Sequence, residues 1–522
     1  MALTVYGKGY KQISSCDTTT SGGTWSGFTF TVDNLTFKEG AAALSCVVKT
    51  AGDNTIIFTP TSAVDLSGIK HVRWWILLTH GNILNTEVNG GLQFWVSDGS
   101  NTGYWKIMGR DTYPGGWINP VIDVSKACDS GTKPSNMNAI TTMGFRINLT
   151  AAGKNAINTW FDNLIICDGL IVHGDVGGDY FGFGHIYDIE NTATGSWGVL
   201  RKFGGQYFSV GSLEIGDSGS TAATKFKAKS SILVFENRRV NNVLYKLNAA
   251  DGGSDTKTTE FILGDKAGSS GIEGCYIRTQ DTSQTCKYTI DGATDADVTV
   301  FKLYGTTFFD ASGSFFPSYY TASVETLNCN FEQCGEIFPG PSTVKYSNII
   351  SADDIGIRIS GSAHHVTNCN FISCPNAVEL PSTASISYDA NMFSNNTYDA
   401  INTSGQEVIV NKTNGSNPSN YNPGGSVVVY SASFIHKLTN LVQNTEVTYV
   451  RVSDQTVLFN VENVDGTGIT EYTHGGGETV DILIHHINYV PDISNIYDLV
   501  LPNANVEVKI QQFLDDVYYN PS

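Results

Sequence analysis

Three absences set the first limits on this chain of 522 residues. It contains no apolar run of about eighteen residues, which excludes a membrane-spanning helix. Charged residues make up only 16% of the chain, against about 25% in a typical soluble protein. Basic residues are also scarce, because 31 stand against 50 acidic ones and leave a net charge of −19. We therefore expect no nucleic acid and no anionic membrane surface as a partner, since both carry negative charge.

The N-terminus lacks the elements of a secretory signal. Residues 1–8 have neither a basic start nor an apolar core, so we expect no signal peptide and synthesis in the cytosol. Gly, Asn, Ser and Thr, by contrast, are abundant. These residues suit turns and tightly stacked strands, and they predict a mostly β protein. The length of the chain favours two to four domains.

A hexapeptide that returns after forty residues is the strongest pattern in the sequence. Residues 329–334 read Cys-Asn-Phe-Glu-Gln-Cys, and residues 369–374 read Cys-Asn-Phe-Ile-Ser-Cys. Related runs at 347–349 and 391–393 give a period of about twenty residues. Such repeats hide their apolar faces by stacking coil on coil. We expect an interior stack of Phe331, Ile349, Phe371 and Phe393, and an amide ladder of Asn330, Asn348 and Asn370.

In these coils the chain resembles the right-handed parallel β-helix family, which includes pectate lyases and the tailspikes of bacterial viruses. The resemblance implies a β-helix over residues 169–404, with regular coils at 323–404. The two cysteine pairs, at 329/334 and 369/374, would lie two coils apart, or about 9.6 Å. That separation is too large for a disulfide between the pairs or for one shared zinc ion. We interpret these cysteines as buried packing residues.

The tryptophans mark a separate N-terminal domain, because all eight fall before residue 200. Short alternating runs separated by turn residues predict a β-sandwich over residues 1–168. The order of Cys16-Asp17, Trp25, the run 117–124 and the closing run 160–164 resembles jelly-roll carbohydrate-binding modules. That resemblance implies a structural calcium ion held by Asp17 and Asp162. The alternative is that each aspartate caps a turn. Calcium takes six or more oxygens, whereas only two ligands can be named here.

Two adjacent tryptophans, Trp74 and Trp75, bear on sugar binding by this domain. Neighbouring residues of a strand point to opposite faces, so one indole should enter the core and the other should face outward. An outward indole can stack on a sugar ring, whereas burial is the more common fate of tryptophan. Both interpretations stay open at this point.

The periodicity stops after residue 404. Residues 411–425 are rich in Asn, Ser, Gly and Pro and are typical of a linker or a broad loop. Alternating runs then return, and they predict a small C-terminal β-sandwich over residues 405–522. The stretch from 450 to 491 is similar to transthyretin-like and immunoglobulin-like modules, which implies a fold and no activity.

One segment carries candidate catalytic residues. Polygalacturonase-like β-helix enzymes use paired aspartates with a histidine on a later coil, and this resemblance implies roles for Asp353, Asp354 and His365. In such sites one carboxyl acts as general acid while the other activates water. The Gly-His-Gly and Arg-x-Lys contexts of that family are missing here. The alternative is a polar corner before a strand, which leaves the chain without a catalytic residue.

A stacked β fold without an export signal is typical of a virion component, which is made in the host cytosol and leaves on the particle. We therefore expect a non-enzymatic phage virion protein for architecture or adhesion: a capsid decoration, a spike or a tail-associated fibre. Its expected partners are other virion proteins and host surface glycan, and a homotrimer is one open arrangement. We expect no cofactor beyond calcium. The rival hypothesis is a tailspike-type polysaccharide depolymerase.

Overall fold

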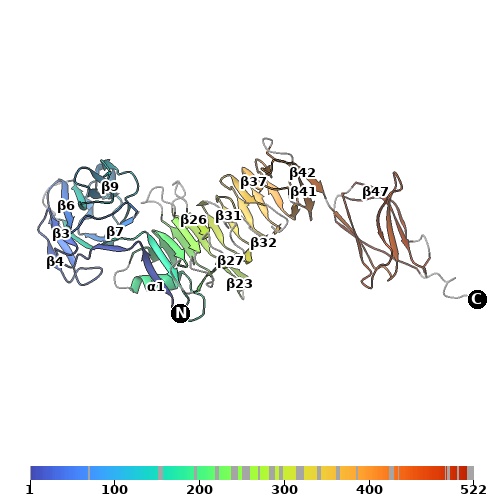
Figure 1. Ribbon diagram of the computed structural model, residues 1–522, viewed down its shortest axis with the longest axis horizontal. Coiled ribbons are helices and arrows are strands. Elements are labelled where there is room, and N and C mark those ends of the chain that lie inside the picture. Colours follow the sequence, from blue (N-terminus) through green and yellow to red (C-terminus); the bar gives the residue numbers. More distant parts are fainter. Residues whose placement is uncertain are drawn as a thin grey trace, which may run out of the picture. The chain divides into compact units, whose positions relative to one another are not determined.

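The computed structural model describes most of the chain, and almost all of its elements are strands (Figure 1). It describes residues 2–513 except 69–70, 151–156, 193–196, 218–222, 237–244, 250–258, 269–270, 281–287, 293–297, 313–322, 338–342, 360–364, 384–385, 423–427, 433, 476, 488, 491–493 and 503–504. Within these ranges the α-helical segment is α1 (Phe183–Thr192). None of the described helices has the length and apolar character needed to cross a membrane.

The chain divides into two compact units. The first comprises Met1–Glu325 and Glu332–Cys334, and the second comprises Thr326–Phe331 and Gly335–Ser522. Each unit contains one β-sandwich and one set of parallel strands. Two strands, β30 (Ser323–Leu327) and β31 (Asn330–Glu332), fall at the division.

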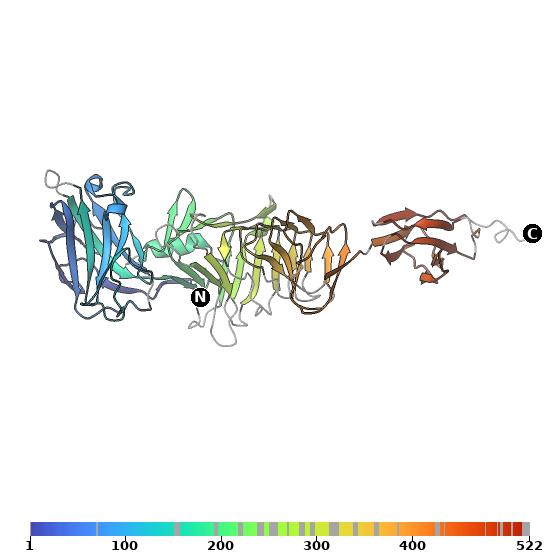
Figure 2. The ribbon, with the colours of Figure 1, turned by 90° about the horizontal axis from the view of Figure 1, so that it is seen from above.

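Two sheets form the N-terminal sandwich, as the sequence predicts (Figure 2). One sheet has the order β10 (Trp117–Ile118), β7 (His71–Leu78), β14 (Ile157–Ile166), β5 (Ala43–Val48) and β4 (Thr31–Asp33), with β2 (Lys11–Ser14) and β11 (Val121–Asp123) at its sides. The other has the order β12 (Ser130–Gly131), β9 (Thr102–Met108), β8 (Leu92–Ser97), β13 (Thr142–Leu149), β6 (Gly52–Pro60) and β3 (Gly23–Ser26). Two short 3-10 turns, η1 (Gly81–Ile83) and η2 (Glu87–Asn89), connect β7 to β8.

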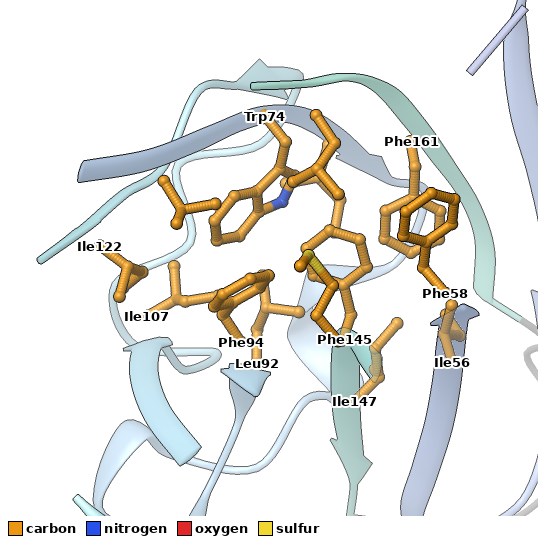
Figure 3. Close-up of a cluster of buried hydrophobic side chains, with 14 of the residues drawn as sticks. Ile56, Phe58, Trp74, Leu92, Phe94, Ile107, Ile122, Phe145, Ile147 and Phe161 are labelled. Atoms are coloured by element: carbon orange, nitrogen blue, oxygen red, sulfur yellow. The ribbon is translucent and has the colours of Figure 1, made fainter. Parts of the chain in front are cut away.

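Aromatic rings fill the space between the two sheets (Figure 3). Each inner face takes alternate residues of its strands, so β7 contributes Trp74 and β13 contributes Phe145. The Phe145 ring stacks on Phe161 with centroids 4.5 Å apart, and Trp74 lies 4.9 Å from Phe145. Such pairs add about 1 kcal/mol each beyond the burial of apolar area. This core anchors β7, whose outer face carries the residues discussed below.

Parallel strands follow the sandwich in the first unit. One series joins β15 (Gly169–His173), β18 (Ser212–Ile215), β21 (Tyr245–Ala249), β26 (Tyr288–Gly292) and β29 (Ala311–Ser312). A second joins β17 (Gln206–Ser209), β20 (Ile232–Phe235), β25 (Tyr276–Thr279) and β28 (Thr307–Phe309), with β16 (Leu200–Phe203) antiparallel to β17. A third joins β19 (Thr224–Ala228), β22 (Thr259–Leu263) and β27 (Val298–Tyr304). The strands β23 (Asp265–Gly268) and β24 (Gly271–Glu273) form a hairpin.

The first strand of the chain does not belong to the sandwich. Strand β1 (Thr4–Lys8) pairs antiparallel with β15, which in turn pairs parallel with β18. The boundary that we expected at residue 168 therefore leaves out this contribution of the N-terminal residues to the parallel series. The pairing joins residues more than 160 positions apart in the sequence, so no local pattern could indicate it.

The second unit contains the regular repeats. Strands β33 (Asn348–Ile350), β36 (Asn370–Ile372) and β39 (Met392–Ser394) pair in parallel, each with its counterpart about 22 residues later. A second series runs through β32 (Thr343–Lys345), β35 (His365–Thr367), β38 (Ile386–Asp389), β41 (Val408–Thr413) and β42 (Val428–Ala432). A third comprises β34 (Ile355–Arg358), β37 (Asn376–Leu380) and β40 (Ile401–Asn402).

The interior stack and the amide ladder of the repeats are both present. Ile349, Phe371 and Phe393 are in register, and the two phenyl rings stack with centroids 4.9 Å apart. The Asn348 side chain donates to Asn330 Oδ1 at 2.6 Å, and the Asn370 side chain donates to Asn348 Oδ1 at 2.7 Å. Successive repeats are thus joined through both their apolar and their amide side chains.

The parallel pairing continues beyond the boundary that we expected at residue 404, since β41 and β42 extend the second series. The Asn- and Pro-rich segment before β42 is bonded to the preceding repeat. Asn417 Oδ1 accepts the Phe393 N–H at 2.7 Å, and Asn420 Oδ1 accepts the Asp399 N–H at 2.8 Å. A segment whose asparagine side chains bond the backbone of a neighbouring repeat is as rich in asparagine as a linker is. This similarity explains why the sequence suggested a linker.

Two further sheets form the C-terminal sandwich. One has the order β46 (Thr470–His474), β43 (Phe434–Thr439) and β49 (Val506–Lys509), and the other has the order β45 (Val457–Val461), β44 (Glu446–Arg451), β47 (Thr479–His485) and β48 (Ile496–Val500). Their shared core includes Leu438, Val447, Tyr449 and Ile482.

Candidate functional site

The sequence candidates for catalysis lie at a turn. Asp353 and Asp354 fall between β33 and β34, and both are exposed. Asp354 Oδ1 accepts the Asn376 side-chain amide at 3.1 Å, and its carbonyl oxygen accepts the Asn376 N–H at 2.9 Å. His365 begins β35, a strand of a different sheet, and its side chain lies outside the described residues. Asp354 therefore supports the next repeat through its turn.

A second acidic group, which the sequence reasoning missed, lies on the third parallel series. Arg358 Nε donates to Glu336 Oε1 at 2.8 Å and to Glu379 Oε2 at 2.5 Å. Thr403 Oγ1 donates to Glu379 Oε1 at 2.8 Å. The four side chains come from four successive repeats, and both carboxyl groups are largely shielded from solvent. We call these residues the Glu336–Glu379 cluster.

The two carboxyl groups of this cluster titrate apart. Burial, together with a hydrogen bond to Glu379, raises the pKa of Glu336 to about 7. Burial also acts on Glu379, but hydrogen bonds from Glu336 and Thr403 hold the pKa of that carboxyl below its usual range. The pair therefore holds one proton, beside a guanidinium group, at a pH where an ordinary glutamate has lost it.

Such a pair has the acid and base character that glycoside hydrolysis uses. Glycosidase carboxyls, however, stand about 5 Å or more apart, on either side of the bond that they cleave. Here both carboxyls contact the same arginine and each other, which is the arrangement of an ion-pair ladder between repeats. A charge alternation at 336, 358 and 379, about one repeat apart, is the sequence signal that could have identified the cluster.

The proposed calcium ligands are held by one loop of the N-terminal sandwich. Asp17 Oδ1 accepts the N–H groups of Ala41 and Ala42 at 2.8 and 2.9 Å. Asp162 Oδ2 accepts the N–H groups of Lys38 and Glu39 at 2.7 and 2.8 Å. Both aspartates thus anchor residues 38–42, as the turn-capping interpretation requires.

Asp162 retains one feature that turn capping does not explain. Its side chain is fully buried, and its Oδ1 atom has no hydrogen-bond partner. Burial raises the pKa of Asp162 to about 6, and the nearby Glu39 and Asp17 add to the effect. A hard cation would suit this oxygen. In the described part of the chain no three acidic, histidine or cysteine side chains gather as a metal site, so the remaining ligands would be backbone or amide oxygens and water.

The cysteines are packing residues, as predicted for the repeats. Cys369 and Cys374 are buried, with their Sγ atoms each 3.6 Å from a carbonyl oxygen of the preceding repeat, that of Val344 and of Ile349. Burial raises the pKa of the Cys369 thiol to about 12. A thiol with so high a pKa is a poor metal ligand and a poor nucleophile at neutral pH.

The two adjacent tryptophans face opposite sides of β7. Trp74 is buried in the sandwich core, and the half-buried Trp75 lies on the outer face. The Trp75 indole donates to Glu39 Oε1 at 2.5 Å, and Lys38 Nζ lies 4.9 Å from the indole centroid. Trp75 also lines a cavity of about 150 Å³ together with Tyr187, Glu190, Asn191, Gly198, Leu200, Arg201 and Lys202. This cavity, hereafter the Trp75 cavity, is a second candidate site.

No known protein family matches the chain, and no curated protein matches it. Solved structures are similar to parts of it. An exo-β-agarase is 12% identical over 28% of this chain and 23% of its own length, with a TM-score of 0.23. A family 11 carbohydrate-binding module of a Clostridium thermocellum cellulase is 11% identical over 32% of this chain and 88% of its own, with a TM-score of 0.20. A family 30 carbohydrate-binding module is 16% identical over 27% and 73%, with a TM-score of 0.19.

The chain spans about a quarter of the agarases that it matches and 56% of another carbohydrate-binding module. At TM-scores near 0.2 these likenesses carry no argument about this chain. The proposed function therefore rests on the geometry of the chain itself.

Proposed function

We propose that this protein is a non-enzymatic component of the exterior of a phage virion, with a role in architecture or adhesion. In sequence order it would comprise a jelly-roll sandwich, a right-handed parallel β-helix and a C-terminal sandwich. The observation that carries the proposal is the parallel pairing of successive repeats, joined by the Asn330–Asn348–Asn370 amides. A stack of this kind resists local opening, because each repeat is bonded to both neighbours.

Particle labelling tests the virion assignment. An antibody raised against the protein should decorate intact, purified particles, and the chain should remain with the particles through density-gradient purification. A protein that stays in the soluble fraction of the lysate, with unlabelled particles, would refute a place on the virion exterior.

Two outward aromatic groups support an adhesive role of the N-terminal sandwich. On one sheet Trp75 lines the Trp75 cavity. On the other sheet the Arg146 guanidinium lies 4.9 Å from the half-buried Tyr104 ring. Aromatic rings next to fixed polar groups are the usual means of binding sugars. Host surface glycan is therefore the ligand class that we propose.

A tailspike-type depolymerase is the second candidate, and the Glu336–Glu379 cluster is the observation in its favour. We expect host capsule or lipopolysaccharide to keep its chain length during incubation with the protein, because the cluster contacts Arg358 instead of flanking a substrate. Size-exclusion chromatography of the glycan measures this, with a known glycan hydrolase as positive control.

If cleavage does occur, two double variants identify the residues responsible for it. Loss of cleavage in Glu336→Gln with Glu379→Gln would establish the enzyme and place its site at the cluster. Loss only in Asp353→Asn with Asp354→Asn would restore the residues that the sequence suggested. Either result would overturn the non-enzymatic proposal.

We also propose that Asp17 and Asp162 help to hold a structural calcium ion, supported by the buried Oδ1 of Asp162 without a hydrogen-bond partner. A carboxyl whose folded pKa is raised stabilises the fold at low pH and loses that contribution as pH rises through about 6. In chelator, the wild-type protein should therefore lose about 2–3 kcal/mol relative to Asp162→Asn between pH 4 and pH 7.5.

Calcium should reverse this loss. At pH 7.5 it should raise the melting midpoint of the wild type and leave that of Asp162→Asn unchanged, since only the carboxylate gains a cation. Equal responses of the two proteins to calcium would refute the calcium site. A stability difference between them that does not change with pH would refute the raised pKa of Asp162.

A further inference from the structure

The Trp75 cavity lies where three elements of the first unit meet. Trp75 comes from the outer face of β7, Tyr187 and Glu190 come from α1, and Arg201 and Lys202 come from β16. Its volume of about 150 Å³ is smaller than most ligand sites, which span about 300 Å³ or more. It therefore has room for about one sugar residue, and the rest of a glycan would lie outside the cavity.

The floor of this cavity is rigidly held. Both carboxylate oxygens of the buried Glu190 accept backbone N–H groups, those of Val199 at 2.6 Å and Leu200 at 2.8 Å. From the other side the fully buried Arg73 donates to the Gly198 carbonyl oxygen at 3.0 Å. Residues 198–200 are thus fixed between a carboxylate and a guanidinium group. A site held in this way loses little conformational freedom when a ligand enters.

Positive side chains lie near aromatic rings in and beside the cavity. Lys202 Nζ lies 5.9 Å from the Tyr187 ring and 5.5 Å from the Tyr207 ring, and Lys38 Nζ lies 4.9 Å from the Trp75 ring. Arg201 Nη2 donates to the carbonyl oxygen of Asn119 at 2.5 Å, which orients its guanidinium group. Three of the six cation–aromatic contacts in the described part of the chain lie at or beside this cavity.

The acidic groups at and beside the cavity are held by neutral N–H donors. Glu190 has both oxygens engaged by backbone N–H groups, and burial raises its pKa to about 7. Glu39 accepts the indole N–H of Trp75 and the side-chain amide of Asn163. Among the side chains that line the cavity, the cations Arg201 and Lys202 stand against the single carboxyl group of Glu190. This balance favours a ligand with an apolar ring face and a negative charge.

We propose that the Trp75 cavity binds one carboxylated sugar residue of an acidic glycan, with its ring against Trp75 and Tyr187 and its carboxylate toward Arg201 and Lys202. The inference rests on the proposed adhesive function and names the ligand class of one site within it. A carboxylate suits the cavity because the guanidinium and ammonium groups are its best donors. A neutral sugar would form no ion pair with the Lys202 ammonium group.

Calorimetric titration with methyl glucuronide and methyl glucoside tests the proposal. The two compounds share a ring and differ in the carboxylate, and we expect the glucuronide to bind at least ten-fold more tightly. Lys202→Gln should weaken glucuronide binding about ten-fold with an unchanged melting midpoint. Trp75→Ala should abolish the binding of both sugars. The matched control is Lys266→Gln, because Lys266 also lies over an aromatic ring, 5.3 Å from Tyr304, and does not line the cavity.

Several results would overturn the proposal. Equal affinity for the two sugars would refute selection of a carboxylate, and equally tight binding of inorganic phosphate would reduce the site to a plain anion site. No binding of either sugar would remove the cavity as a glycan site. Adhesion is tested separately: retention on host glycan that persists in Trp75→Ala would place it elsewhere, whereas glucuronide binding without retention on host glycan would keep the ligand class and refute adhesion.

Discussion

Replacing Phe371 by aspartate should prevent the protein from accumulating in soluble form. Phe371 is fully buried and stacks on Phe393, so the substitution removes an aromatic contact and places an unpaired charge inside the repeat. The two effects together should cost roughly 5 kcal/mol or more, a large part of the stability of an ordinary domain. Soluble yield and the melting transition of the second unit measure the effect.

The neighbouring residue supplies the control. Ile372 lies next to Phe371 on β36 and is only partly buried, so Ile372→Asp makes the same chemical change on the outward side of the strand. It should express and melt nearly as the wild type does. If Phe371→Asp melted like Ile372→Asp, the inward register of these repeats would be wrong.

Replacing Arg73 by methionine should lower the melting midpoint of the first unit by roughly 10 °C. Arg73 is fully buried and donates to the carbonyl oxygens of Cys167, Gly198 and Val210. Methionine fills similar space but leaves three buried carbonyl oxygens without the guanidinium donor, and it removes a positive charge that lowers the pKa of Glu190. Losses of this kind cost about 3–5 kcal/mol, which corresponds to that shift for a domain of this size.

Arg110→Met is the matched change at an exposed arginine of the same unit and should alter the midpoint by less than about 2 °C. Scanning calorimetry of the three proteins measures both shifts. Similar midpoints for Arg73→Met and the wild type would show that the buried guanidinium does not hold residues 198–210 against β7.

The repeats could be predicted in detail because their chemistry is periodic. A phenylalanine or isoleucine returns to the interior at each turn, and an asparagine returns beside it, so the register of Ile349, Phe371 and Asn370 follows from the sequence alone. Alternation along β7 likewise separated Trp74 from Trp75, although the sequence did not specify which of the two would be buried.

The sites could not be predicted in the same way, because they depend on contacts between distant residues. Arg73 donates to the Val210 carbonyl oxygen across 137 positions, and Trp75 and Arg201 line one cavity although they belong to different sheets. The Glu336–Glu379 cluster lies on a periodic series, but the residues alternate in charge and so escape a search for identical residues. The aspartates at 353 and 354 became catalytic candidates because paired carboxyl groups suit acid–base chemistry. In the structure Asp354 accepts a hydrogen bond from Asn376 and supports a turn.

The buried cysteines can report how often each segment of this protein opens locally. Cys16, Cys46 and Cys167 lie in or beside the N-terminal sandwich, and Cys275, Cys369 and Cys374 lie among the parallel strands, all of them buried. An alkylating reagent can modify such a thiol only while its segment is transiently exposed to solvent. The rate at which each cysteine is labelled under native conditions therefore measures how often its own segment opens. Peptide mapping of a time course would chart where along the chain unfolding begins, without any engineered probe.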